Sequence, residues 1–190
     1  MESLILASAS PRRSELLRRA GIPFEVQAAE VDEHCEGPAS AAVKVLSARK
    51  ALAVHPLFPS RFILGADTLV ELDGVVLGKP AGPEEAADML RRLSGRTHQV
   101  YTGVTVVSPS GEVLTDCDRS DVTFGDVTEA EIAACVRSGE PLDKAGAYAI
   151  QGRASLWISR MEGSYSSVIG LPLYLVRSLL LRAGFPLLGD

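Results

Sequence analysis

Ser3-Leu4-Ile5-Leu6-Ala7-Ser8-Ala9-Ser10-Pro11-Arg12-Arg13-Ser14-Glu15-Leu16-Leu17 is the stretch that decides the fold class. Its apolar start, Ser3–Ala7, predicts a short buried strand. Ser10 followed by Pro11 predicts a helix start, with Ser as the N-cap and Pro at the first helical position. Gly21 then offers a natural C-cap. A buried strand that leads directly into a helix is typical of α/β proteins.

The rest of the chain continues this alternation and interrupts it with hairpins. Further strands are expected at Phe24–Ala28, Arg61–Ala66, Leu69–Leu72, Val75–Leu77, Gln99–Val107, Glu112–Phe124 and Ala154–Arg160, and helices at Ala39–Val54, Pro83–Leu93, Thr128–Arg137 and Pro172–Ala183. Asp73-Gly74 and Ser108–Gly111 predict the hairpin turns. The expected class is therefore α/β with a mixed sheet rather than a doubly wound parallel one. Since no repeat or linker is evident, residues 1–190 are expected to form one domain.

Composition excludes several classes of protein. A hydrophobic fraction of 46% in 190 residues excludes a disordered chain. A net charge of −5 argues against nucleic-acid binding. Three cysteines without a CxxC pair indicate neither a disulfide framework nor a zinc site, and they favour the reducing cytosol. We find no signal peptide and no membrane-spanning run, so a cytoplasmic protein is expected.

The junction between the first strand and the first helix is the first candidate site. A helix N-terminus presents free N–H groups that favour an anion. Arg12 and Arg13 in the first turn oppose the helix dipole, which makes them costly unless they bind something negative. Two guanidinium groups can grip a phosphate bidentately. The alternative is a pair of solvated arginines on an amphipathic helix.

Asp67 is the second candidate. It follows Phe62-Ile63-Leu64, so it is expected to end a buried strand, where α/β folds place ligands. A carboxylate there can bind a divalent metal or take a proton from water. It can equally end the strand by a hydrogen bond within its own turn.

Later segments add cations and an amide. Lys79, in a Gly-Lys-Pro turn that is not a P-loop, can reach phosphate as a point charge. Lys144 can neutralise phosphate, and Gln151 can read a base edge through its paired donor and acceptor. The alternatives are a plain turn at Lys79 and, around Lys144 and Gln151, a tight loop with an exposed ion pair. Glu30–Glu33 can add metal ligands or be a solvated acidic turn, and His98 is expected to be structural.

Five motifs in this order resemble the Maf family of house-cleaning nucleoside triphosphate pyrophosphatases, across essentially the whole chain. They are Ser8–Leu17, Gly65–Thr68, Gly78–Pro80, Asp143–Tyr148 with Ile150–Gly152, and Val168–Pro172. The resemblance implies a fold similar to that of inosine triphosphate pyrophosphatases: an elongated, curved mixed sheet flanked by helices, with a central cleft between two lobes. It also implies a cytoplasmic enzyme, often a homodimer, that uses Mg²⁺ or Mn²⁺ to convert a nucleoside triphosphate to the monophosphate and pyrophosphate. No nucleic-acid or membrane partner is expected.

The resemblance also implies roles for ten residues. Asp67 is the expected proton acceptor, and it shares the expected metal site with Glu33. The remaining catalytic and substrate-binding positions are Lys50, Lys79, Ser8, Arg12, Arg13, Thr68, Lys144 and Gln151. Only four of the 19 cations are lysines, and three of these four belong to this set.

Three of these positions look like the branch of the family that acts on dTTP and UTP: Arg13, Thr68 and Gln151. The branch acting on 7-methyl-GTP typically has Trp in place of Arg12, Gln in place of Thr68 and Glu in place of Gln151. Ala149 stands where the dTTP/UTP branch often has Gly. The alternatives are a preference for CTP, 7-methyl-GTP or a modified pyrimidine triphosphate, and a nucleotide-binding regulator of septum formation and cell division.

Overall fold

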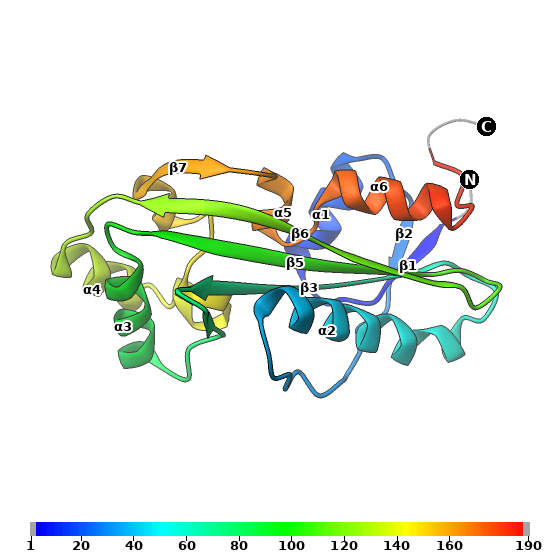
Figure 1. Cartoon of the computed structure of the whole chain (residues 1–190), viewed down its shortest axis with the longest axis horizontal. Coiled ribbons are helices and arrows are strands. Elements are labelled where there is room, and N and C mark those ends of the chain that lie inside the picture. Colours follow the sequence, from blue (N-terminus) through cyan, green and yellow to red (C-terminus); the bar gives the residue numbers. More distant parts are fainter. Residues whose placement is uncertain (1–2, 188–190) are drawn as a thin grey trace.

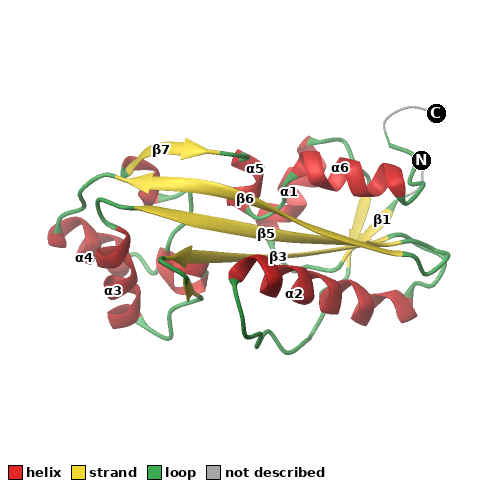
Figure 2. Cartoon of the chain, viewed as in Figure 1, coloured by secondary structure: helices red, strands yellow, loops and turns green. Residues whose placement is uncertain are grey.

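A seven-stranded mixed sheet runs along the length of the molecule (Figures 1 and 2). The structure, a computed structural model, describes residues 3–187 of the 190. Strand order is β2-β1-β3-β5-β6-β7, with β4 paired to β3. The strands are β1 Leu4–Leu6, β2 Phe24–Val26, β3 Ile63–Leu72, β4 Val75–Leu77, β5 Thr97–Val107, β6 Val113–Phe124 and β7 Ile158–Glu162. Since β1 pairs in parallel with β2 and β3 while all other pairs are antiparallel, the expected mixed sheet is confirmed.

Within residues 3–187, six α-helices flank this sheet. They are α1 Pro11–Arg19, α2 Ala39–Val54, α3 Pro83–Leu93, α4 Glu129–Arg137, α5 Tyr165–Ile169 and α6 Leu173–Arg182, with 3₁₀ turns at His55–Leu57, Glu140–Asp143, Ala145–Ala147 and Arg153–Leu156. Helix α2 lies along one face of the long strands, while α1 and α6 cover the opposite face at one end (Figure 1). Helices α3 and α4 gather at the other end. No helix among residues 3–187 combines the length and the apolar character that a membrane crossing requires.

The prediction that a strand ends at Asp67 is wrong. Strand β3 continues through Asp67 and Thr68 to Leu72, because β5 pairs with it without interruption from Ile63 to Glu71. The polar side chains at 67 and 68 are compatible with a central strand since each finds a hydrogen-bond partner inside the protein. The segments Arg61–Ala66 and Leu69–Leu72, which were expected to be separate strands, therefore belong to the single strand β3.

The segment before β7 also differs from expectation. Arg153–Leu156 is a 3₁₀ turn rather than the start of a strand. Ala154 and Trp157, three residues apart, pack into the same hydrophobic cluster, and a helical turn provides that spacing while leaving Leu156 86% exposed. The short helix α5 was not expected either. Ser164 caps it by accepting a hydrogen bond from the backbone N–H of Ser167.

The apolar side chains on one face of the sheet divide into two clusters. Leu64 and Ala66 of β3 belong to a cluster with β1, α1 and α6, whereas Val70 and Leu72 belong to a second one with α3 and α4. Thr68 lies between them on the same face, because alternate residues of a strand point the same way. The division gives the molecule two lobes that meet at Thr68.

His98 lies in the core of the second lobe, and we expect it to make stability depend on pH. It is fully buried, its Nε2 lies 2.7 Å from the Tyr148 hydroxyl, and burial lowers its pKa to about 4. The unfolded chain therefore binds a proton between that value and about 6.5. The free energy of unfolding should rise with pH across this window, by up to about 3 kcal/mol.

Urea unfolding at pH 4.5 and 7 measures this effect. The variant His98→Asn has no group that titrates there, so its pH dependence should be smaller by most of that amount. An equal pH dependence in both proteins would contradict a buried neutral imidazole.

Candidate active site

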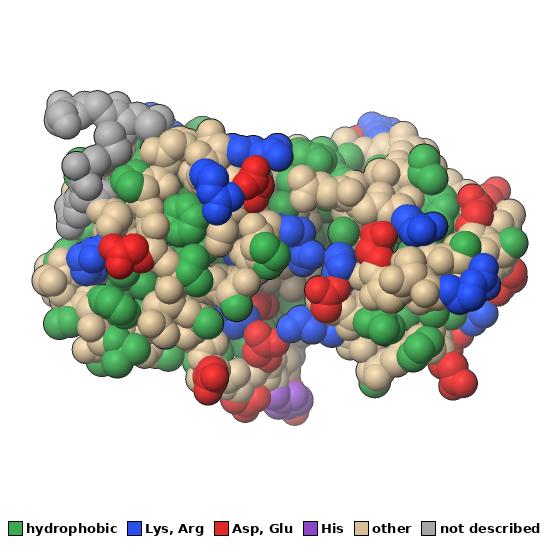
Figure 3. Space-filling model, turned by 180° about the vertical axis from the view of Figure 1, so that it is seen from behind, with side chains coloured by type: hydrophobic (Ala, Val, Ile, Leu, Met, Phe, Trp, Pro, Cys, Tyr) green, Lys and Arg blue, Asp and Glu red, His purple; other side chains and the backbone are tan. Residues whose placement is uncertain are grey.

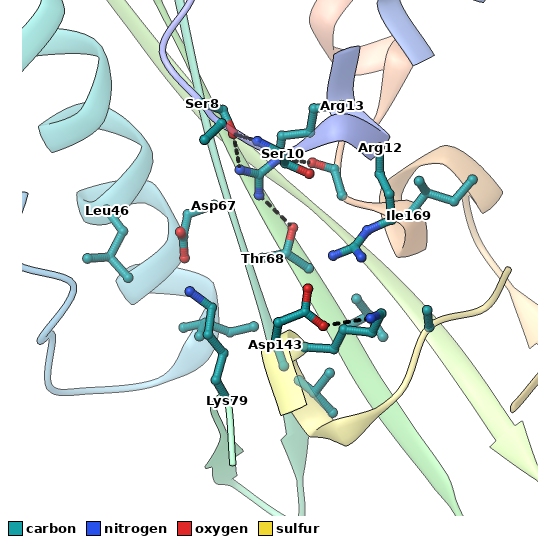
Figure 4. A pocket seen from close by; sticks show the side chains of 18 of the residues that line it. Ser8, Ser10, Arg12, Arg13, Leu46, Asp67, Thr68, Lys79, Asp143 and Ile169 are labelled. Carbon is teal, nitrogen blue, oxygen red and sulfur yellow. Dashed lines mark hydrogen bonds and ion pairs between the residues drawn. The ribbon is translucent and has the colours of Figure 1, made fainter. Parts of the chain in front are cut away.

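A cleft of about 640 Å³ opens where β3 is unpaired on one side (Figures 3 and 4). Strand β1 pairs with β3 only as far as Leu64, and β4 pairs with it only from Val70 onward. The intervening edge of β3 carries Asp67 and Thr68, which point to opposite faces of the sheet. Both reach the cleft because the sheet is interrupted there.

All ten residues expected at the site line this one cleft. They are Ser8, Arg12, Arg13, Glu33, Lys50, Asp67, Thr68, Lys79, Lys144 and Gln151. They come from the β1–α1 junction, the loop before α2, α2 itself, β3, the segment after β4 and the loop that follows α4. Figure 4 shows side chains from several of these segments pointing into the same space. Of the four lysines, Lys44 alone is not among the lining residues.

Arg13 is held rigidly at the back of the cleft. Its side chain donates from Nε to the Gly170 carbonyl at 2.8 Å, from one terminal nitrogen to Ser8 Oγ at 2.9 Å and from the other to Thr68 Oγ1 at 3.3 Å. Burial lowers its pKa, yet no carboxylate lies within ion-pair distance among the described residues. A buried guanidinium without a carboxylate partner favours an anionic ligand.

Lys50 joins two carboxylates on the opposite side of the strand. Its Nζ lies 2.6 Å from Asp67 Oδ1 and 2.7 Å from Glu33 Oε1, so both acids lie close to one ammonium group. Lys50 and Asp67 are buried, whereas Glu33 is exposed. The hydrogen bond from Lys50 lowers the pKa of Glu33, and this effect outweighs the opposing desolvation of the carboxylate. The Glu33 carboxylate is therefore ionised at neutral pH.

Three further cations line the cleft. Lys79 lies 3.3 Å from Glu33, and its side chain is 61% exposed. Lys144 is held by the Glu140 carbonyl at 2.7 Å and by Asp143 Oδ1 at 2.6 Å. Arg12 extends toward the centre of the cleft (Figure 4). The cleft thus combines a buried polar centre with three further cations, of which Lys79 is exposed and Arg12 and Lys144 are half-buried.

Sequence reasoning missed Thr102 and Ser167, the buried residues whose hydrogen bonds support Thr68. Thr102 Oγ1 lies 2.9 Å from Thr68 Oγ1 and donates to the Ser167 carbonyl at 2.9 Å. Both Thr102 and Ser167 are completely buried. One signal was available: a threonine interrupts the apolar alternation of Val100, Val104 and Val106 at the point where Thr68 interrupts that of β3.

Fold and cleft together define an α/β protein with a ligand site built for a polyanion. The family model described as "Maf-like protein" matches residues 3–183, and the chain belongs to this family, which confirms the resemblance of its motifs. A relative named dTTP/UTP pyrophosphatase from Symbiobacterium thermophilum is 50% identical over 190 residues, covering 98% of this chain and 97% of the relative. One of the same name from Moorella thermoacetica is 50% identical over 192 residues, covering 100% and 99%.

Among solved structures, the Staphylococcus aureus Ham1 protein aligns with a TM-score of 0.56 and 13% identity, over 95% of this chain and 99% of that one. This is a likeness of fold, and it confirms the elongated mixed α/β architecture expected from the motifs.

Proposed function

We propose that this protein hydrolyses dTTP, UTP and related modified pyrimidine triphosphates at the α-phosphorus, giving the nucleoside monophosphate and pyrophosphate. The observation that carries the proposal is the gathering of four further cations, Arg12, Arg13, Lys79 and Lys144, around the Lys50–Asp67 pair in one cleft. A nucleoside triphosphate carries about four negative charges, which such a ring can neutralise. The names of relatives 50% identical over nearly the whole chain support the same reaction. The role is one of house-cleaning, the removal of unwanted nucleotides.

Asp67 serves as the proton acceptor. Water attacks the α-phosphorus, the bond to the bridging oxygen of the β-phosphate breaks, and pyrophosphate leaves with the electron pair. The proton of the water passes to Asp67, whose Oδ2 lies outside the hydrogen bond that Lys50 makes with Oδ1. Lys50 keeps the carboxylate in one orientation, and Arg12, Lys79 and Lys144 balance the growing charge on the leaving group.

Asp67 and Glu33 fit a divalent metal site. Mg²⁺ is commonly bound by one or two carboxylates together with substrate phosphates, and these two acids already share one cation in Lys50. No group of three or more His, Cys, Asp or Glu side chains suited to a metal occurs within residues 3–187, so phosphate oxygens would complete the coordination. Bound Mg²⁺ or Mn²⁺ supplies Lewis-acid polarisation of the phosphate and lowers the pKa of water.

Pyrophosphate release from a panel of triphosphates, with and without Mg²⁺, tests the proposal. The panel holds dTTP, UTP, CTP, 7-methyl-GTP and 5-modified pyrimidine triphosphates. Turnover of dTTP and UTP that stops on chelation is the expected result. Tight dTTP binding without any turnover would instead favour a nucleotide-sensing regulator of cell division. A preference for CTP or 7-methyl-GTP would overturn the proposed substrate class.

Gln151→Glu is expected to alter base preference more than phosphate affinity. Gln151 is exposed at the cleft, and its amide offers a donor beside an acceptor, whereas Glu offers acceptors only. We expect kcat/KM for UTP to fall by about tenfold, and inhibition by inorganic pyrophosphate to change little. An unchanged ranking of the panel would exclude Gln151 from base reading.

The cytoplasm as the site of action and a homodimer as the assembly belong to the same proposal. Membership of the Maf family supports both. Sedimentation of the purified chain measures the second directly.

A further inference from the structure

Thr68 and Thr102 form a polar pair inside an otherwise apolar row. They lie directly opposite each other on β3 and β5, and the neighbouring pair on that face is Val70 with Val100. Thr102 is completely buried, while Thr68 reaches the cleft. A buried hydroxyl among valines is costly unless a hydrogen bond requires it. The pair therefore has a purpose that packing does not explain.

The hydrogen-bond chain through this pair has a single direction. The Ser167 carbonyl can only accept, so the one hydroxyl proton of Thr102 is committed to it. Thr102 Oγ1 must then accept in its contact with Thr68, so Thr68 donates its own proton inward. Arg13 occupies one lone pair of Thr68 Oγ1 from the other side. Toward the cleft, Thr68 retains one lone pair and no proton.

The surroundings of Thr68 suit a pyrimidine ring. Val70, Val100, Val168 and Ile169 line the cleft on this side and provide an apolar wall, while the Lys50–Asp67 pair lies across the strand. A planar ring packs against apolar side chains, and a few fixed polar groups then read its edge. Thr68 is such a group, and its orientation decides what it can read.

We propose that Thr102 is a positioning residue for base selection, which fixes Thr68 as a hydrogen-bond acceptor toward the cleft. Uracil and thymine present an N–H at ring position 3, which an acceptor can bind. Cytosine presents a lone pair at that position, which faces the lone pair of Thr68 and is repelled. The proposal rests on the proposed pyrimidine triphosphate function and adds the means by which UTP and dTTP are separated from CTP.

The test compares UTP with CTP in the wild type and in Thr102→Val. Valine keeps the shape and removes the acceptor for the Thr68 proton, so the Thr68 hydroxyl becomes free to rotate and to donate. The ratio of kcat/KM for UTP over CTP should fall by about tenfold, a value typical of one hydrogen bond. Part of that fall should be an absolute gain with CTP, which damage to the fold would not produce.

Two further variants serve as controls. Thr102→Ser keeps the hydroxyl and should hold the wild-type ratio within about twofold. Thr105→Val removes another completely buried threonine hydroxyl of β5, one bonded to Ser47 and Thr115 on the opposite face of the sheet. It should change thermal stability and leave the ratio unchanged.

Calorimetric binding of UTP and CTP in the presence of a chelator separates this inference from the proposed function. A wild type that binds UTP selectively but releases no pyrophosphate would contradict the enzyme and leave the role of Thr102 intact. A Thr102→Val protein that turns over UTP with the wild-type selectivity would overturn the inference alone. Equal wild-type affinity for UTP and CTP would also overturn it.

Discussion

Replacing Asp67 with Asn should lower kcat for UTP and dTTP at least ~100-fold, by the usual magnitude of general-base catalysis. The amide keeps the shape of the side chain and still accepts the hydrogen bond from Lys50 at Oδ1. What it loses is the ability to take the proton of the attacking water. We therefore expect the loss in kcat rather than in KM, measured by steady-state pyrophosphate release at saturating substrate.

Asp116→Asn is the matched control for this loss. Asp116 also pairs with a lysine, Lys44 at 3.2 Å, but it lies on β6 outside the cleft. Its substitution should leave kcat within about twofold of the wild type, since exposed pairs contribute little. Near-normal turnover in Asp67→Asn, with the Asp116 variant equally active, would remove Asp67 from the catalytic role.

Sequence reasoning placed the site residues better than it placed the backbone beneath them. Periodicity located α3 because its apolar face repeats at helical spacing. It divided β3 at Asp67, since polar residues in a central strand look like the end of one. The partners that make Asp67 and Thr68 acceptable there, Lys50 and Thr102, are distant in the sequence.

The cleft itself illustrates the same limit. Local sequence patterns predicted β1, β4 and most of β3. Only the pairing register shows that neither β1 nor β4 pairs with the middle of β3. Motifs scattered over the chain then meet at that gap. The order of motifs could therefore predict which residues belong together, whereas the reason they meet is a property of the sheet.

Gly103→Ala is expected to be strongly destabilising although it adds only one methyl group near the site. A Cβ at Gly103 would stand 2.2 Å from the Val43 carbonyl oxygen and 2.9 Å from the Lys44 nitrogen, both backbone atoms of α2. No side chain can rotate away, so the helix must move. We expect a loss of about 3 kcal/mol or more in the free energy of unfolding, and a fall in Tm of about 10 °C for a chain of this size.

The same substitution should reach the active site, because Gly103 lies directly across from Asp67 in the β3–β5 register and α2 carries Lys50. Displacing α2 separates the Lys50 ammonium from a carboxylate now 2.6 Å away. Activity measured well below the new Tm should therefore fall as well, through the orientation of Asp67. Gly82→Ala is the matched control, since open space surrounds that position and its cost should stay within about 1 kcal/mol. If the Gly103→Ala protein were as stable and as active as the control, the close approach of the α2 backbone to Gly103 would not be required for stability or activity.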